Sequence, residues 1–189
     1  ATWLIGDTLY WKSLTEKGDA LTQSLAGLLT EAPDAEEAVK SQQAKTDALI
    51  AELPLADVQP QSVDGTLKEI FDSPEWNRLS SACLGCGSCT FVCPTCHCYD
   101  IRDYNTGHEI RRFRCWDSCM YSDFTLMAHG NPRTSQVERF RQRFIHKLVY
   151  YPANNEGIYA CVGCGRCIGK CPVSMNIAKV IRTLGGGRK

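Results

Sequence analysis

The pattern of apolar and polar residues predicts a first half built from helices. Leucines recur at helical spacing between residues 21 and 29. Pro33-Asp34 gives a helix start, and residues 35–53 follow as a polar helix. Asp64 is placed to cap another, shorter helix. We therefore expect residues 1–72 to form a helical N-terminal extension.

Helical patterns return in the second half of the chain. Ser135 and Glu138 have the spacing of a capping box, and apolar residues follow at helical spacing as far as Tyr151. A second apolar pattern, between residues 175 and 184, predicts a closing helix that ends at Gly185-Gly186-Gly187.

Cysteine usage adds chemistry to this picture, because all twelve cysteines lie between Cys83 and Cys171. They include an internal repeat, in which Cys83–Pro94 and Cys161–Pro172 share seven of twelve positions. Each copy has the pattern C-x2-C-x2-C-x3-C-P, the bacterial ferredoxin run that binds [4Fe–4S] clusters. A secreted disulfide framework finds no support, because the chain begins with no signal segment.

In two-cluster ferredoxins the fourth cysteine of each run binds the cluster of the other run. This rule assigns one cluster to Cys83, Cys86, Cys89 and Cys171, and the other to Cys161, Cys164, Cys167 and Cys93. Zinc sites or reactive thiols are the alternative, although zinc sites usually present paired C-x2-C elements separated by a longer loop. We predict an α+β chain in which a two-cluster ferredoxin-like domain occupies residues 73–189. The stretch between the two runs, residues 95–160, is predicted to be a long, mainly helical insertion.

Four cysteines stand outside the two runs, and their role is open: Cys96, Cys98, Cys115 and Cys119. They form a plausible four-thiolate set for a third [4Fe–4S] cluster or a zinc ion. Buried thiols that pack near the clusters are the second interpretation. A redox-active dithiol at Cys96 and Cys98 is the third.

The net charge of zero conceals a division between the two halves. Residues 1–82 carry 6 basic and 14 acidic residues, a balance of −8, whereas residues 83–189 carry 15 and 7, a balance of +8. Because each oxidised cluster with its four thiolates carries about −2, the basic half is better explained as compensation for anionic cofactors than as a nucleic-acid surface. We expect the acidic half to dock a partner. The predicted helix over 135–151 has a basic face, interpreted as a solvated face, a docking surface or counter-charge for the clusters: Arg139, Arg141, Arg143 and Lys147.

The sequence contains neither a candidate membrane span nor a recognisable catalytic motif. Mean hydropathy is −0.25, and no apolar run approaches the roughly 18 residues of a membrane span, so we expect none. There is no catalytic constellation, and neither a Walker loop nor a G-x-G-x-x-G motif is present. We therefore expect no flavin or nicotinamide site on this chain.

Three segments point to a family, namely Cys93–Asp100 (C-P-T-C-H-C-Y-D), Cys115–Met120 (C-W-D-S-C-M) and Arg139–Lys147. With the two runs they resemble the dicluster iron–sulfur subunits of the sulfhydrogenase β-subunit and anaerobic sulfite reductase A-subunit type. The resemblance covers roughly residues 64–180. Such subunits carry a further N-terminal region, and the chain begins with Ala1 rather than Met. We therefore expect it to be the end of a longer subunit.

The resemblance implies a non-catalytic electron carrier in a cytoplasmic, anaerobic hetero-oligomer. Its partners would be a flavin/NAD(P)-binding subunit and a terminal redox enzyme such as a [NiFe] hydrogenase. The alternative is a subunit of a sulfite- or sulfur-reducing, or heterodisulfide-reductase-like, complex in which Cys96 and Cys98 are redox-active thiols. Nucleic acid is not expected as a partner.

Overall fold

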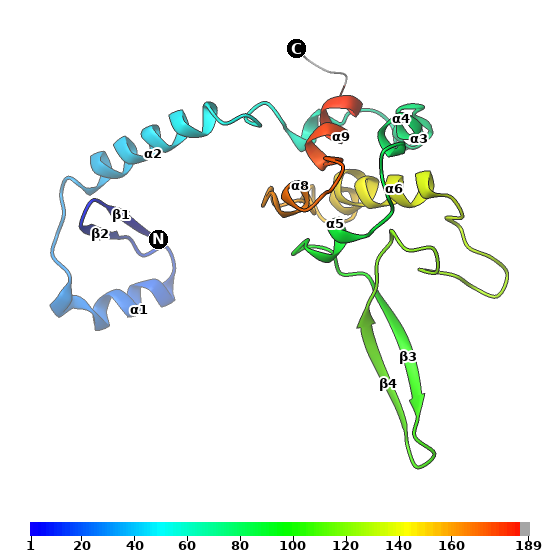
Figure 1. Ribbon diagram of the computed structural model, residues 1–189. Coiled ribbons are helices and arrows are strands. Elements are labelled where there is room, and N and C mark those ends of the chain that lie inside the picture. Colours follow the sequence, from blue (N-terminus) through cyan, green and yellow to red (C-terminus); the bar gives the residue numbers. More distant parts are fainter. Residues whose placement is uncertain (186–189) are drawn as a thin grey trace. The chain divides into compact units, whose positions relative to one another are not determined.

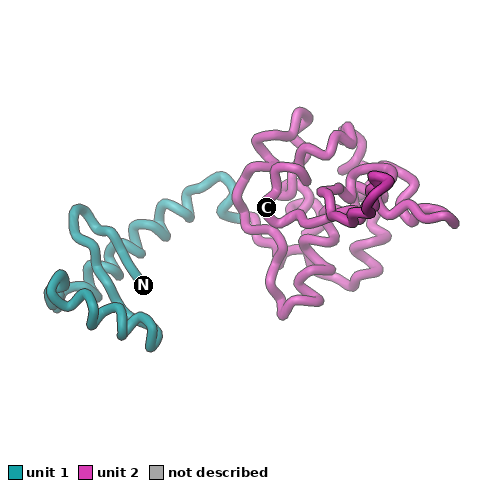
Figure 2. The backbone as a smooth tube through the Cα atoms, turned by 90° about the horizontal axis from the view of Figure 1, so that it is seen from below, with its two compact units in different colours: residues 1–57 teal, residues 58–189 magenta. Residues whose placement is uncertain are grey.

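The chain forms two compact units. The computed structural model describes residues 1–185, and its units are Ala1–Asp57 and Val58–Lys189 (Figure 2). The boundary expected between residues 72 and 73 therefore falls inside the second unit. The reason is that three apolar side chains before that point pack in the core of the second unit: Val58, Val63 and Ile70.

The first unit combines a small β-hairpin with two helices. Trp11 at the end of the hairpin donates from its indole Nε1 to Thr22 Oγ1 at 2.8 Å, which ties the hairpin to the following helix. The hairpin corrects the prediction of a helical extension, because Gly6, with φ of 60°, makes the tight turn that pairs the flanking residues as strands. Within residues 1–57 no side chain is fully buried. The elements are β1 (Thr2–Ile5), β2 (Thr8–Trp11), α1 (Glu16–Ser24), the 3-10 turn η1 (Ala26–Leu28) and α2 (Ala35–Ala51).

The second unit is a set of mostly short helices and one hairpin (Figure 1). Its elements are η2 (Pro60–Ser62), α3 (Leu67–Asp72), α4 (Glu75–Ser80), α5 (Ser88–Phe91), β3 (Tyr99–Asn105), β4 (Ile110–Trp116), α6 (Gln136–Ile145), the π-helical turn η3 (His146–Tyr150), α7 (Tyr151–Asn154), α8 (Arg166–Gly169) and α9 (Ile177–Leu184). The expected α+β class is confirmed as a mixture of helices and two separate two-stranded sheets.

One hydrophobic core joins α3, α4, α6, η3 and α9. At its centre the Trp76 and Phe140 rings meet edge to face, with centroids 6.4 Å apart. The Trp76 indole donates to the Ile70 carbonyl at 2.6 Å, so its polar atom is satisfied inside the core. Four cysteines of the two runs pack against this core: Cys83, Cys161, Cys167 and Cys171. The core thus provides the rigid support on which the cysteine loops lie.

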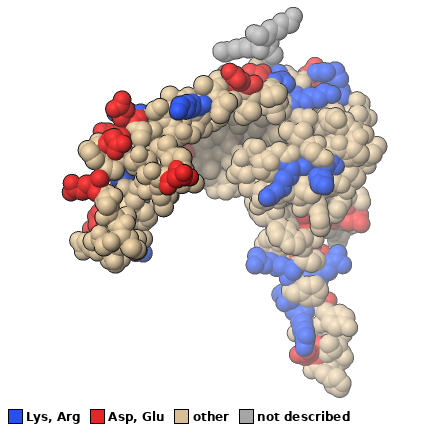
Figure 3. Space-filling view, turned by 60° about the vertical axis from the view of Figure 1, so that its left-hand side comes forward, with Lys and Arg blue, Asp and Glu red and all other residues tan. Residues whose placement is uncertain are grey.

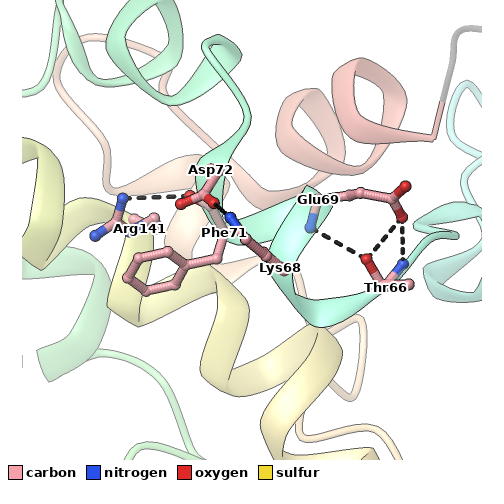
Figure 4. Close-up of polar contacts among 6 residues, drawn as sticks. All are labelled: Thr66, Lys68, Glu69, Phe71, Asp72 and Arg141. Carbon is pink, nitrogen blue, oxygen red and sulfur yellow. Dashed lines mark hydrogen bonds and ion pairs between the residues drawn. The ribbon is translucent and has the colours of Figure 1, made fainter.

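Two capping boxes fix the helix starts around this core. The one predicted at Ser135 and Glu138 is confirmed, and it begins α6. Asp64, however, does not cap α3, because the structure places Thr66 at that position, with Glu69 completing a capping box (Figure 4). Asp64 instead accepts a hydrogen bond from the neighbouring backbone N–H of Gly65 at 2.8 Å.

An arginine of α6 fastens this helix to α3. The Arg141 guanidinium lies 3.5 Å from the centre of the Phe71 ring and donates to the Phe71 carbonyl at 3.2 Å (Figure 4). This contact combines a cation–π interaction with a hydrogen bond. It ties Arg141 to α3 at the surface of the unit.

The insertion at residues 95–160 is not mainly helical, which corrects the sequence prediction. β3 and β4 form an antiparallel hairpin that projects from the helices, with Tyr99 opposite Trp116 (Figure 1). Aromatic and β-branched residues in both segments, with Gly107 between them, favour strands over a helix here. Arg112 braces the hairpin through two hydrogen bonds to the Asp103 carboxylate, at 2.7 and 2.8 Å. Basic side chains gather along this hairpin, whereas acidic ones gather on the first unit (Figure 3).

The remaining helix predictions hold in outline. The helix expected over 135–151 is present as α6, η3 and α7, so a π-helical turn interrupts it. The closing helix is α9, capped by Asn176, and Gly186 and Gly187 lie outside the described residues. None of the helices in residues 1–185 has the length and apolar character that crossing a bilayer requires.

Candidate metal centre

The two cysteine runs fold into the same local shape. In each, two glycines adopt the left-handed backbone that other residues rarely take: φ is 68° and 72° at Gly85 and Gly87, and 67° and 72° at Gly163 and Gly165. Each second glycine caps a single-turn helix, α5 or α8, that carries the third cysteine of its run. These glycines bend each loop so that its three cysteines follow one another around a tight turn.

The two loops differ in what surrounds them, and this difference yields a prediction. A Cβ added at Gly87 would lie 2.6 Å from the Tyr121 ring, whereas at Gly165 it would meet nothing within 4 Å. Gly165→Ala should therefore cost only the backbone penalty of about 1–2 kcal/mol, and Gly87→Ala should cost clearly more. Urea titration of both variants under anaerobic conditions, followed by circular dichroism, measures the difference. Equal losses of stability would show that the Tyr121 side chain moves aside with no cost in free energy.

Four cysteines from both ends of the domain line one pocket. They are the first three of the first run and the last of the second: Cys83, Cys86, Cys89 and Cys171. Most of the other lining residues are apolar, and Arg143 adds one positive charge. The backbone N–H of Met175 donates to Cys171 Sγ at 3.1 Å, a hydrogen bond that suits a thiolate. Four thiolate donors around a mostly apolar pocket that is also lined by one cation fit an anionic [4Fe–4S] cluster.

A short chain of hydrogen bonds links Cys93 of the second set to the start of the second run. Helices α5 and α8 pack against each other. Cys93 Sγ lies 3.3 Å from the Thr95 hydroxyl, which donates to the Ala160 carbonyl at 2.5 Å. Ala160 directly precedes Cys161, so the end of the first run meets the start of the second. This donor set also consists of thiols alone, with Cys164 exposed and the other three partly buried.

Neighbouring groups shift the acidity of several run cysteines. Hydrogen bonding from Cys96, followed by that from Thr95 and the charge of Lys147, lowers the pKa of Cys93 to about 4. Hydrogen bonds from Ser88 lower the pKa of Cys86. Burial raises the pKa of Cys89. Metal ligation requires the thiolate form, which the hydrogen bonds at Cys93 and Cys86 stabilise.

The four cysteines outside the runs have different hydrogen-bond partners. Cys96 hydrogen-bonds with Cys93, and Cys98 with Cys119, whose hydrogen bond lowers the pKa of Cys98 to about 6. Cys115 lies on β4, where its Sγ donates to the Asp100 carbonyl at 3.8 Å. Across residues 1–185, no three Cys, His, Asp or Glu side chains converge as ligands of a single metal ion. The third site and the redox pair at Cys96 and Cys98 both stay predictions.

The basic face of α6 is not a solvated face throughout, which corrects that interpretation. Arg143 and Lys147 are buried, at 3% and 4% exposure. The sequence held a signal for this, because Phe140, Arg143, Phe144, Lys147 and Leu148 follow the helical spacing of a single face. The solvated-face interpretation of these two residues rested on their charge alone.

Comparison with known protein families identifies the kind of domain that has this geometry. Residues 82–175 match the family described as the 4Fe-4S dicluster domain. This segment is a 4Fe-4S dicluster domain. The match begins one residue before Cys83 and ends four residues after Cys171, so it contains both runs and everything between them. Two [4Fe–4S] clusters are therefore the cofactors of this domain.

One curated relative extends the comparison beyond the domain itself. Over 113 residues, 59% of this chain, the sequence is 42% identical to the sulfhydrogenase 2 subunit beta of Pyrococcus furiosus. That alignment covers 33% of the relative, so the chain corresponds to about a third of its length. No solved structure matches the chain.

Proposed function

We propose that this chain relays electrons through its two [4Fe–4S] clusters, between a flavin/NAD(P)H-linked subunit and a terminal redox enzyme such as a [NiFe] hydrogenase. One observation carries the proposal: α5 and α8, which hold the third cysteine of each run, pack side by side. Two clusters on these loops would be neighbours, so an electron taken up by one can pass to the other. The relative is named as a subunit of a sulfhydrogenase, which supports a hydrogenase as the partner.

The ligand assignment is part of this proposal. Cys83, Cys86, Cys89 and Cys171 bind one cluster, and the pocket that all four line supports this set. Cys161, Cys164, Cys167 and Cys93 bind the other, supported by the relay of hydrogen bonds between Cys93 and the start of the second run. When bound, the clusters supply the one-electron chemistry. The chain holds their sulfurs in place, shields them with the apolar core and tunes their potentials through charge and hydrogen bonds.

Anaerobic analysis of the purified chain tests the proposal. We expect about eight irons and eight sulfides per chain, and EPR signals of reduced [4Fe–4S] clusters after addition of dithionite. Clusters that accept no electron over the accessible range of potentials would limit them to a structural role. Isolation of the intact complex from an anaerobic, reducing cytoplasm then identifies the donor and the terminal enzyme by the subunits that accompany the chain.

A further inference from the structure

Two buried cations lie on the inner face of the helix that crosses the domain. Arg143 on α6 and Lys147 on η3 are four residues apart, one helical turn, and each is at least 96% shielded from solvent. Burial of a cation without a facing anion is strongly unfavourable, because the charge loses its hydration. The helix therefore carries these charges at a cost that nearby negative charge must offset. The fold holds no carboxylate in a salt bridge with either of them among residues 1–185.

Arg143 lies between the two cysteine runs. Its side chain lines the pocket of the first cysteine set, with its guanidinium 4.3 Å from the centre of the Phe144 ring. Burial alone would lower the pKa of Arg143, but the thiolates of Cys89 and Cys167, one from each run, raise it. Its Nε is buried and has no hydrogen-bond partner among the described protein atoms. This N–H group is therefore available to donate a hydrogen bond to a sulfur atom of a bound cluster.

Lys147 lies at the junction of the second cysteine set. Its ammonium donates to Thr95 Oγ1 at 2.9 Å and to the Ala160 carbonyl at 3.2 Å. Its own carbonyl accepts from the Ala160 N–H at 3.3 Å, so side chain and backbone both hold the residue before Cys161. The π-helical turn provides this position, and such turns often occur at functional sites.

We propose that Arg143 and Lys147 set the reduction potentials of the two clusters, with Arg143 acting on both and Lys147 mainly on the cluster bound by Cys93. The inference rests on the proposed electron transfer. A reduced cluster carries one more negative charge than an oxidised one. A nearby cation in an environment of low dielectric constant therefore stabilises the reduced state more than the oxidised state. Each cation therefore raises the potential, and its removal lowers it.

Redox titration of the full chain, purified anaerobically and monitored by EPR, tests this role. Arg143→Met should weaken electron uptake by both clusters at least tenfold, which is about 59 mV for a one-electron couple. Lys147→Met should lower the potential of one cluster only. Arg143→Lys keeps the charge and should recover most of the loss. Arg141→Met is the matched control, because Arg141 is a cation of the same helix that contacts Phe71, and its removal should leave both potentials unchanged.

The outcomes separate this role from a structural one and from the proposed function. Arg143→Met and Lys147→Met chains that keep their iron and show wild-type potentials would overturn the inference. If Arg143→Met loses its clusters, Lys147→Met decides alone, and an unchanged potential there overturns the inference too. Wild-type clusters that take up no electron would instead overturn the proposed function.

Discussion

A chain in which Cys83 and Cys86 are both replaced by alanine will keep one [4Fe–4S] cluster, and that cluster will depend on Cys93 but not on Cys171. The expectation follows from crossed ligation, in which the fourth cysteine of each run serves the other cluster. The structure supports the crossing, since Cys171 lines the pocket of the first run and Cys93 connects through Thr95 to the start of the second.

Iron content and EPR measure this dependence. Loss of the first cluster should reduce iron from about eight to about four per chain. Addition of Cys171→Ala to that background should change nothing further, because its cluster is already absent. Addition of Cys93→Ala should lower the iron again and alter or abolish the remaining signal. The reverse pattern, sensitivity to Cys171 and indifference to Cys93, would show that each run binds its own cluster with all four of its cysteines.

Replacement of Trp76 with alanine is expected to destabilise the second unit by about 3–5 kcal/mol, the usual cost of truncating a buried aromatic side chain. Trp76 is 1% exposed at the centre of the core, and its loss also leaves the Ile70 carbonyl without its donor. Since domains of this kind are stable by only about 5–15 kcal/mol, the variant should unfold at much lower urea concentration. The measurement is urea titration of the cluster-loaded chain under anaerobic conditions, with circular dichroism for the helices and visible absorbance for the clusters.

Trp116 offers the matched control for this experiment. It is the same residue type, lies at the end of β4 and is 77% exposed. Trp116→Ala should change stability by no more than about 0.5 kcal/mol. Equal urea midpoints for the two variants would show that the helical core contributes little to the stability of the domain, and that the clusters alone hold it together.

Strands were harder to predict from the sequence than helices. Capping boxes are local, so Ser135 and Glu138 announce α6 without help from the rest of the chain. The hairpins had weaker signals that helical spacing obscured. These were Gly6 between Trp3-Leu4-Ile5 and Leu9-Tyr10-Trp11, and Gly107 between two segments that contain aromatic residues and isoleucine. Each strand forms its ladder of hydrogen bonds with a partner strand, and the periodicity of a single segment contains no information about that partner.

The sequence by itself determined the chemistry of this protein. Two runs of four cysteines with fixed spacing and turning glycines specify thiolate loops for [4Fe–4S] clusters, because loop geometry and ligand type are local properties. Only the tertiary structure decided what surrounds those loops. Burial depends on contacts between distant segments. The packing of α6 and η3 therefore makes Arg143 and Lys147 buried cations, Arg143 beside cysteines of both runs and Lys147 at the start of the second run.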